Sequence, residues 1–306
     1  MDWHGKTVLI TGGTGFIGSH LAEHLYAKGA IVRIPYRQEN SWRMEHDNVM
    51  DFRQGDIADA AFAREAIEGV DHVFHLASFR RNIAYHQQNI TEVAEKNVQM
   101  ANAIADAVRH HPAPLTFFST ANIPPDARDD TRTSTDGYQL GKALCEEVFT
   151  SLASDAQIPL LCVRPVSVYG PRDKFSKDSN VVPALITKAV EEEHTLTVWG
   201  SGKQHRKFVF VTDVIDATLA LLDAGATGVQ YVSPPNTVAI AELATIICKH
   251  AHPNLALAFD TTKPEGPHQD TPLPFHPCLA SFPWKTLESG IAETITWWKE
   301  QRQLQL

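Results

Sequence analysis

Cysteine is scarce in this sequence and does not cluster. The four cysteines lie far apart without a C-x-x-C pair, so we expect neither a zinc cluster nor a disulfide framework. Long apolar runs are also missing, because none reaches the ~18 residues that a bilayer span needs. The N-terminal stretch MDWHGKTVLITGG does not read as a secretory leader. We therefore expect a cytoplasmic protein without a membrane segment.

Basic residues are fewer than acidic residues in this sequence. Lysine and arginine number 27 against 36 acidic residues, which gives a formal net charge of -9. Nucleic-acid binding needs concentrated positive charge, so we expect no nucleic acid as a partner, and any anionic ligand must be held by local groups. The 15 histidines show no metal-ligand spacing, and we expect no metal.

The pattern of apolar runs predicts the fold class. Short apolar runs such as TVLIT, HVFHLAS and LTFFST alternate with longer amphipathic stretches through the first half of the chain. This predicts an α/β protein with a doubly wound parallel sheet. After residue 170 the sequence is richer in loop signals and proline. We predict a dinucleotide-binding domain over 1–170 and 206–228 and a smaller, discontinuous α/β substrate domain over 171–205 and 229–306, with a helix of 213–223 packing on the sheet.

A glycine-rich turn follows the first predicted strand. Gly12, Gly15 and Gly18 form G-x-x-G-x-x-G between a strand that ends at Thr11 and a helix that opens near Phe16. Glycines allow close backbone approach, and a helix N-terminus offers free N–H groups and partial positive charge to a pyrophosphate. The segment predicts dinucleotide binding; a purely structural turn is the alternative.

The second strand bears on the choice of cofactor. An acid at its end bonds the ribose hydroxyls of NAD, whereas an arginine accommodates the 2′-phosphate of NADP. Arg37 stands there and slightly favours NADP, although Glu39 keeps NAD open, and Arg33, Arg37 and Arg43 have an alternative interpretation as surface charges. Asp56, in QGDI, follows the third strand, where it would accept from the adenine amino group or cap the next helix.

A tyrosine and a lysine stand four residues apart in YQLGK. On a helix, Tyr138 and Lys142 share one face. A phenol has a reference pKa of about 10, and a nearby ammonium favours its ionised form. Tyr138 would then exchange a proton with a substrate oxygen while Lys142 holds the nicotinamide ribose. Ser119 and Thr120 end the preceding strand, where either hydroxyl would bond the same oxygen. A solvated helix face and an ordinary loop hydroxyl are the alternatives.

Together these segments resemble the extended short-chain dehydrogenase/reductase family, in particular its nucleotide-sugar epimerases, dehydratases and ketoreductases. The resemblance covers nearly the whole chain. The matching segments, in order, are TGGTGFIGSHL, GDI, HVFHLAS, EKNVQMANAI, FFSTANI, YQLGK, VRPVSVYGPRD, NVVPALI, VWGSGKQHRKFVFVTDV and FPWKTLESGIAETITWW.

The resemblance implies roles for individual residues. It implies an active triad of Thr120, Tyr138 and Lys142, with Ser119 as the fallback. Asn97 would be a structural or proton-relay residue on the active-site helix. The other implied cofactor contacts are Gly12, Gly15, Phe16, Ile17, Gly18, Asp56, Ile57, Leu76, Ala77, Ser78, Pro165 and Val168.

Substrate contacts are implied further along the chain. Asn180 and Arg206 match positions that hold the nucleotide diphosphate; a helix N-cap and a loop charge are their alternatives. Arg80 and Arg81 follow the HLAS strand and would meet an acidic sugar or a phosphate, unless they belong to a solvated loop. We expect a nucleotide-diphosphate sugar as the substrate.

Departures from the family pattern narrow the reaction. Ala121 and Asn122 stand where the sugar dehydratases carry an Asp-Glu pair, so we do not expect dehydration. The cysteine and histidine of the fucose-type synthases are not matched either. What remains is hydride exchange at a sugar carbon, expected to be carbon 4, in an NAD(P)-dependent epimerase or 4-ketoreductase. Arg37 favours the reductase and Asn180 the epimerase.

Two rival functions stay open at this stage. VRIPYR resembles the second strand of dihydroflavonol-type reductases, which act on small carbonyl compounds with NADPH. A noncatalytic dinucleotide-sensing protein is the rival from a different class. The family that this chain resembles often pairs through a four-helix bundle, so the resemblance implies a homodimer. The helices over VAEKNVQMANAIADAV and KALCEEVFTSLA carry apolar faces that would supply the bundle, and packing on the sheet is their alternative.

Overall fold

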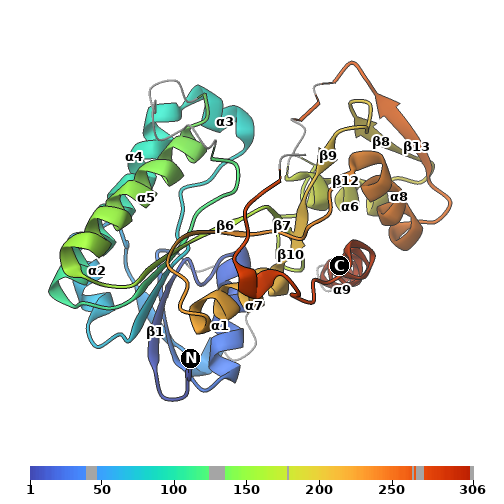
Figure 1. Cartoon of the computed structure of the whole chain (residues 1–306). Coiled ribbons are helices and arrows are strands. Elements are labelled where there is room, and N and C mark those ends of the chain that lie inside the picture. Colours follow the sequence, from blue (N-terminus) through green and yellow to red (C-terminus); the bar gives the residue numbers. More distant parts are fainter. Residues whose placement is uncertain (39–46, 124–134, 178, 264, 267–271, 304–306) are drawn as a thin grey trace. The chain divides into compact units, whose positions relative to one another are not determined.

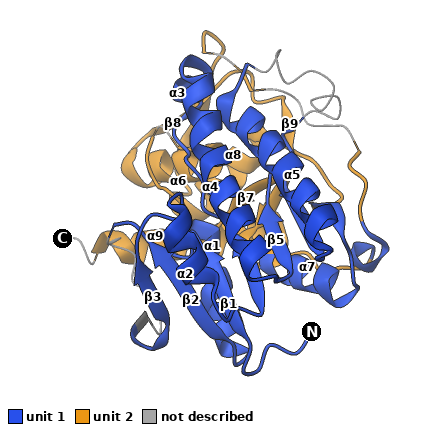
Figure 2. Cartoon of the chain, turned by 90° about the vertical axis from the view of Figure 1, so that its left-hand side faces the viewer, with its two compact units in different colours: residues 1–165, 215–231, 276–280 blue, residues 166–214, 232–275, 281–306 orange. Residues whose placement is uncertain are grey.

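The chain divides into two compact units. The computed structural model describes residues 1–38, 47–123, 135–177, 179–263, 265–266 and 272–303 (Figure 1). Unit 1 comprises residues 1–165, 215–231 and 276–280, and unit 2 comprises 166–214, 232–275 and 281–306 (Figure 2). Relative to the expected division, 166–170 and 206–214 fall in unit 2, and 229–231 and 276–280 fall in unit 1. The functional division into cofactor and substrate domains stays a prediction.

Unit 1 is built on a seven-stranded sheet in the order β11-β6-β5-β4-β1-β2-β3. The strands are β1 (Thr7–Thr11), β2 (Ile31–Tyr36), β3 (Asp51–Gln54), β4 (His72–His75), β5 (Leu115–Phe118), β6 (Leu160–Pro165) and β11 (Gly228–Val232). Every neighbouring pair from β6 to β3 is parallel. The chain order reverses between β1 and β4, and ligands of such sheets bind outside the carboxyl ends of the strands at that point. The predicted doubly wound sheet is confirmed.

Helices cover both faces of this sheet. They are α1 (Phe16–Ala27), α2 (Ala60–Ile67), α3 (Ile83–Gln88), α4 (Ile90–His110), α5 (Gly137–Ala156) and α7 (Val211–Asp223). Figure 1 shows α2, α4 and α5 on one face and α1 on the other. Apolar side chains of the sheet and of α4 and α5 form the core between them, including the fully buried Leu9, Ile104, Phe117 and Phe149. This packing holds the strand ends rigidly.

The start of α5 places the YQLGK segment. The Asp136 carboxylate accepts hydrogen bonds from the amides of Tyr138 and Gln139 at 2.8 and 3.0 Å, which is the usual way to satisfy a helix N-terminus. Gly137 follows because a Cβ there would lie 2.5 Å from the Ile90 carbonyl oxygen. The cap and the close approach to α4 therefore fix Tyr138 in the first turn of α5.

The described residues of unit 2 form three two-stranded sheets and three further helices. The strand pairs are β7 (Ser167–Tyr169) with β10 (Phe208–Phe210), β9 (His205–Arg206) with β12 (Val238–Ala239), and β8 (Thr195–Trp199) with β13 (Ala256–Asp260). The helices are α6 (Val181–Glu191), α8 (Ile240–Ala251) and α9 (Leu287–Gln303). Short 3-10 turns are η1 (Asp47–Val49) and η3 (Pro277–Leu279), both in unit 1. None of the described helices combines the length and apolar character of a membrane span.

Candidate active site

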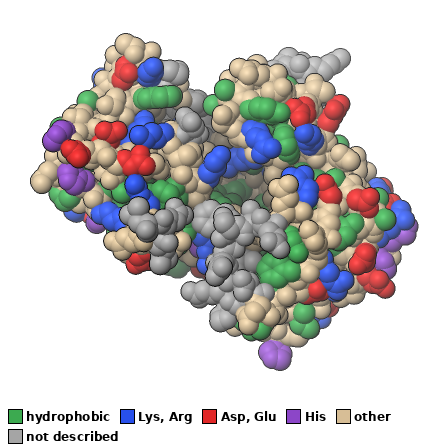
Figure 3. Space-filling model, turned by 180° about the vertical axis from the view of Figure 1, so that it is seen from behind, with side chains coloured by type: hydrophobic (Ala, Val, Ile, Leu, Met, Phe, Trp, Pro, Cys, Tyr) green, Lys and Arg blue, Asp and Glu red, His purple; other side chains and the backbone are tan. Residues whose placement is uncertain are grey.

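A cavity of about 610 Å³ lies within unit 1 at the carboxyl ends of its parallel strands. Residues at or just beyond the ends of six strands line it, namely Thr11, Arg37, Asp56, Ala77, Ser119 and Pro165. It therefore occupies the place where a doubly wound sheet collects its ligands. Acidic and basic side chains are interspersed over the face of the molecule in Figure 3. The lining of the cavity is mainly basic instead. Its charged residues are one acid, Asp56, and the cations Arg37, Arg80, Arg81, Lys96 and Lys142.

The glycine turn forms one wall of this cavity. Gly12 has a φ of +70°, and a Cβ there would lie 2.7 Å from the Ala77 amide nitrogen. A Cβ on Gly18 would collide with the Gly12 carbonyl. The cavity is lined at the start of α1 by Gly15, Phe16, Ile17 and Gly18. The first turn of α1 holds no acidic side chain, so its positive end suits a diphosphate.

A buried hydroxyl joins the two strands at the switch point. The Thr11 Oγ1 accepts from the amides of Leu76 and Ala77, both at 3.2 Å, and lies 2.8 Å from the His75 Nδ1. Its single proton therefore goes to His75, whose Nδ1 is an acceptor in a neutral ring. Burial, followed by the charge of Lys142, lowers the pKa of His75 to about 3. The ends of β1 and β4 are thus fastened together beside the cavity.

Arg37 and Asp56 face each other at the end of β2 and β3. The Arg37 Nη1 lies 3.7 Å from the Asp56 Oδ2, and both side chains are exposed. Asp56 Oδ1 also accepts from the Ala58 amide at 3.0 Å. The N-cap of α2 is Asp59, which accepts from the Phe62 amide at 2.9 Å. The alternative that Asp56 caps this helix is therefore wrong, and its adenine contact stays a prediction.

The other cations near β2 differ from Arg37. Arg33 donates from Nε to Asp51 at 2.8 Å and from Nη1 to the Ala66 carbonyl at 2.9 Å, so it ties β2 to β3 and α2 rather than facing a ligand. Glu39 and Arg43 lie outside the described residues. Of Arg33 and Arg37, the described arginines considered for a contact with the cofactor ribose, Arg37 thus lines the cavity.

Tyr138, Lys142 and Ser119 line the same cavity as the glycine turn. The Lys142 ammonium is buried, donates to the Phe118 carbonyl at 2.7 Å and lies 5.8 Å from the centroid of the Tyr138 ring. Among the described residues, the buried Ser119 hydroxyl has no hydrogen-bond partner. Buried polar groups normally have a hydrogen-bond partner, so a ligand oxygen in the cavity would give this hydroxyl its partner.

Thr120 is placed differently from its neighbour. Its side chain is buried, its Oγ1 accepts from the Asn122 amide at 3.3 Å, and it does not line the cavity. The geometry therefore favours Ser119, the fallback implied by the family resemblance, over Thr120 as the hydroxyl that faces a ligand. The catalytic roles of both residues stay predictions.

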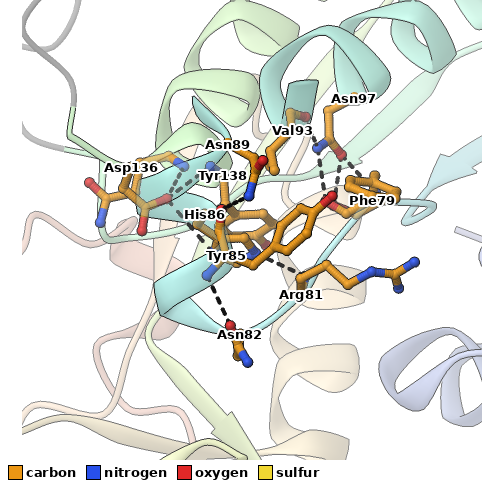
Figure 4. A network of polar contacts seen from close by, with 12 residues as sticks. Phe79, Arg81, Asn82, Tyr85, His86, Asn89, Val93, Asn97, Asp136 and Tyr138 are labelled. Carbon is orange, nitrogen blue, oxygen red and sulfur yellow. Dashed lines mark hydrogen bonds and ion pairs between the residues drawn. The ribbon is translucent and has the colours of Figure 1, made fainter. Parts of the chain in front are cut away.

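Asn97 lies on α4 behind the cavity wall. Its Oδ1 accepts from the Ser78 hydroxyl at 2.8 Å and the Phe79 amide at 3.0 Å. Its Nδ2 donates to the carbonyls of Phe79 and Val93 at 3.0 and 2.7 Å (Figure 4). These bonds hold the segment after β4 against α4 and favour the structural interpretation of Asn97. A direct cofactor contact stays a prediction.

The remaining expected contacts divide between the two units. Ile57, Leu76, Ala77, Ser78, Pro165 and Arg80 line the cavity of unit 1. Val168 is on β7, Asn180 precedes α6 and Arg206 is on β9, all in unit 2. Asn180 occupies the N-cap position without a side-chain capping bond, and burial lowers the pKa of Arg206. Their substrate roles stay predictions.

The sequence patterns did not single out His86, which packs on Tyr138. The two ring centroids are 5.4 Å apart with planes 16° apart (Figure 4). The Arg80 guanidinium lies 5.5 Å from the Tyr138 ring centroid. His86 comes from α3, 52 residues earlier in the chain than Tyr138, so no local spacing relates them. Such a contact is visible only once α3 and α5 are folded together.

Comparisons with known proteins agree with this arrangement. A model of the NAD dependent epimerase/dehydratase family matches residues 8–234. The chain is 28% identical over 320 residues to a dTDP-4-dehydro-6-deoxy-D-allose reductase of Streptomyces bikiniensis, covering 97% of both. It is 29% identical over 323 residues to a UDP-N-acetyl-alpha-D-glucosaminuronate decarboxylase of Bacillus cytotoxicus, covering 96% of this chain and 98% of that protein.

A solved structure shows the same fold. UDP-glucuronic acid 4-epimerase from Bacillus cereus, in complex with UDP-glucuronic acid and NAD, matches with a TM-score of 0.80 at 21% identity, covering 96% of this chain and 99% of that one. The family match spans the glycine turn, the strand ends and the YQLGK segment that meet in the cavity. The chain is thus an enzyme of the NAD dependent epimerase/dehydratase family, of the extended short-chain dehydrogenase/reductase type.

Proposed function

We propose that this enzyme exchanges a hydride at carbon 4 of a nucleotide-diphosphate sugar, with NADP or NAD as its cofactor. The observation that carries the proposal is that one cavity is lined by the glycine turn together with Tyr138, Lys142 and Ser119. A bound nicotinamide dinucleotide supplies a group that accepts and returns a hydride. The proposed cofactor contacts are those named from the sequence, and those in unit 1 line this cavity except Asn97.

The side chains supply the proton transfer. Tyr138 takes the proton of the sugar hydroxyl when that carbon is oxidised and gives it back when the ketone is reduced. Lys142, held by the Phe118 carbonyl, places a positive charge beside the phenol and within reach of a ribose. The Ser119 hydroxyl bonds the same sugar oxygen. Asn180 and Arg206 hold the diphosphate, and Arg80 adds positive charge near the sugar.

Two outcomes follow from the same half-reaction. If the ketone rotates in the site and takes the hydride back from the same cofactor on its other face, the enzyme is a 4-epimerase; if an incoming ketone takes the hydride of a reduced cofactor, which then leaves in oxidised form, it is a 4-ketoreductase. Arg37 in the cavity and the Streptomyces reductase relative favour the ketoreductase. The resemblance of Asn180 and the segment after it favours the epimerase. The decarboxylase relative adds UDP-N-acetyl-alpha-D-glucosaminuronate to the substrates worth testing, and the Bacillus cereus epimerase structure adds UDP-glucuronate.

The test begins with the cofactor. Denaturing the purified enzyme and identifying the released dinucleotide separates the outcomes, since retained NAD indicates the epimerase and loosely held NADP the reductase. A panel of UDP- and dTDP-sugars is then titrated for thermal stabilisation, because a ligand that binds the native state raises its stability. The proposal fails if neither dinucleotide binds, or if small carbonyl compounds are reduced and no nucleotide sugar is turned over.

One substitution addresses the rival from another class. Tyr138→Phe removes the acid–base group while keeping the ring. An enzyme then loses turnover and still binds its dinucleotide, whereas a noncatalytic dinucleotide sensor keeps its response to the cofactor. The cytoplasmic location stays a prediction, and fractionation of the producing cells checks it.

A further inference from the structure

The Tyr138 ring rests on a second flat ring. The His86 imidazole lies nearly parallel to the phenol, 5.4 Å away between centroids and 16° apart in orientation, and only 5% of His86 is exposed (Figure 4). Helix α5 fixes the backbone of Tyr138, but the position of the phenol oxygen depends on the first side-chain torsion, and the plane of the ring depends on the second. What packs against the ring therefore decides where the phenol oxygen points.

Both nitrogens of His86 are engaged. The Nε2 accepts from the Arg81 amide at 2.9 Å, so it carries no proton, and the proton of the neutral ring sits on Nδ1. The Nδ1 lies 4.0 Å from the Asp136 Oδ1, the same oxygen that receives the amide of Tyr138. The carboxylate that anchors the backbone of Tyr138 thus also lies beside the edge of the ring that supports it.

Charged groups approach His86 from each element packed around it. Asp136 comes from the start of α5, and Arg80 and Arg81 come from the segment after β4. On the α4 side, Glu92 receives the hydroxyl of Tyr85, a neighbour of His86 on α3, at 2.7 Å. Burial lowers the pKa of His86; Asp136 opposes this and Arg80 adds to it. The imidazole is therefore neutral at pH 7.

Protonation of His86 would break its contact with the segment after β4. A proton on Nε2 would turn that atom into a donor facing the Arg81 amide, which is also a donor. The segment that carries Arg80 and Arg81 would then lose its anchor, and the Tyr138 ring would lose the orientation of its support.

We propose that His86 is a positioning residue, whose neutral imidazole, which accepts from the Arg81 amide and faces the Asp136 carboxylate, orients the phenol of Tyr138. This rests on the proposed function of Tyr138 as the acid–base group. His86 touches neither reacting atom in this role; it acts through the Tyr138 ring.

Two variants separate the flat ring from the imidazole nitrogens. His86→Phe keeps an aromatic surface, and His86→Ala removes it. With UDP-glucose or UDP-glucuronate and NAD or NADP, we expect kcat of His86→Ala to fall about 10–100-fold, because small misplacements of an acting group cost rate, with KM within about twofold. His86→Phe should recover most of kcat at pH 8. His72→Phe, which replaces another buried histidine outside the cavity, is the control and should keep kcat.

A second readout needs no turnover. In the ligand-free enzyme with ring-labelled tyrosine, the NMR signals of Tyr138, assigned with Tyr138→Phe, should shift in a titration whose midpoint lies below 6.5, and His86→Phe should abolish that step. The proposal is overturned if the NMR signals of Tyr138 do not shift as His86 titrates, or if His86→Ala leaves kcat unchanged. If the wild type turns over none of these sugars, the proposed function fails while the NMR titration still decides the role of His86.

Discussion

A single step along the chain, from Ser119 to Thr120, decides which hydroxyl enters the cavity. Ser119 lines it with a hydroxyl that lacks a partner among the described residues, while Thr120 bonds the Asn122 amide outside it. We predict that Ser119→Ala lowers kcat about 100-fold, because one donor to a reacting oxygen is worth roughly that much. Thr120→Ala is the matched control and should cost less than about tenfold in steady-state kinetics. If Thr120→Ala instead lowers kcat more than Ser119→Ala does, Thr120 belongs to the triad.

Arg37 gives a second prediction for a single side chain. Its guanidinium is exposed, lines the cavity and lies 3.7 Å from Asp56, where a 2′-phosphate would compete for it. Arg37→Ser should weaken NADP binding at least about tenfold and leave NAD binding within about twofold, since a charge-assisted bond to phosphate is lost. Fluorescence titration with both dinucleotides measures this, with Arg64→Ser on α2 as the control. Equal weakening of both would show that Arg37 does not read the 2′-phosphate.

Strand β4 makes stability depend on pH. Burial lowers the pKa of His72 to about 4, and that of His75 is lowered to about 3 by burial and by Lys142. The unfolded chain protonates both near 6.5, so it binds more protons than the native state below that pH. Stability therefore falls as the pH drops from about 6.5 through these native values, and it is fully present above 6.5.

We expect the midpoint of thermal unfolding to decrease steadily from pH 7 to pH 4.5, by an amount equivalent to a few kcal/mol. Calorimetry at several pH values measures it. His75→Gln should flatten the decrease, because an amide does not titrate in this range. A pH-independent midpoint would contradict the assignment of neutral, buried rings to β4.

The sequence patterns that predicted the site either lie within one short segment or depend on where the predicted parallel strands end. The glycine turn and the Tyr138–Lys142 spacing depend only on short segments, and parallel strands bring their carboxyl ends to one edge. Details set by neighbours at a distance were missed. Asp59 rather than Asp56 caps α2, Arg33 is taken by Asp51, and the support of Tyr138 by His86 joins residues from separate helices.

Helices α4 and α5 pack side by side (Figure 2). A shallow cavity of about 450 Å³ lies over them, and its lining includes the half-buried Val98, Leu140 and Leu144. We propose that this face pairs with a second copy as a homodimer, as predicted from the apolar helix faces.

The dimer is tested by mass in solution. Light scattering should give twice the mass of one chain, and Leu144→Glu should give one chain, because a charge buried in a pairing face lacks a partner. Ile31→Glu, at an exposed apolar position on β2, is the control and should leave the mass unchanged. A wild type with the mass of one chain refutes the pairing.

The Thr11 hydroxyl carries one more consequence. By bridging His75 and the backbone after β4, it fixes this wall of the crevice through the protein's own hydrogen bonds. A preformed crevice spares the ordering cost that an induced one would impose on association. The gain in affinity applies to the dinucleotide that we propose binds at this end of the cavity. A dinucleotide that dissociates slowly would stay bound through repeated turnovers.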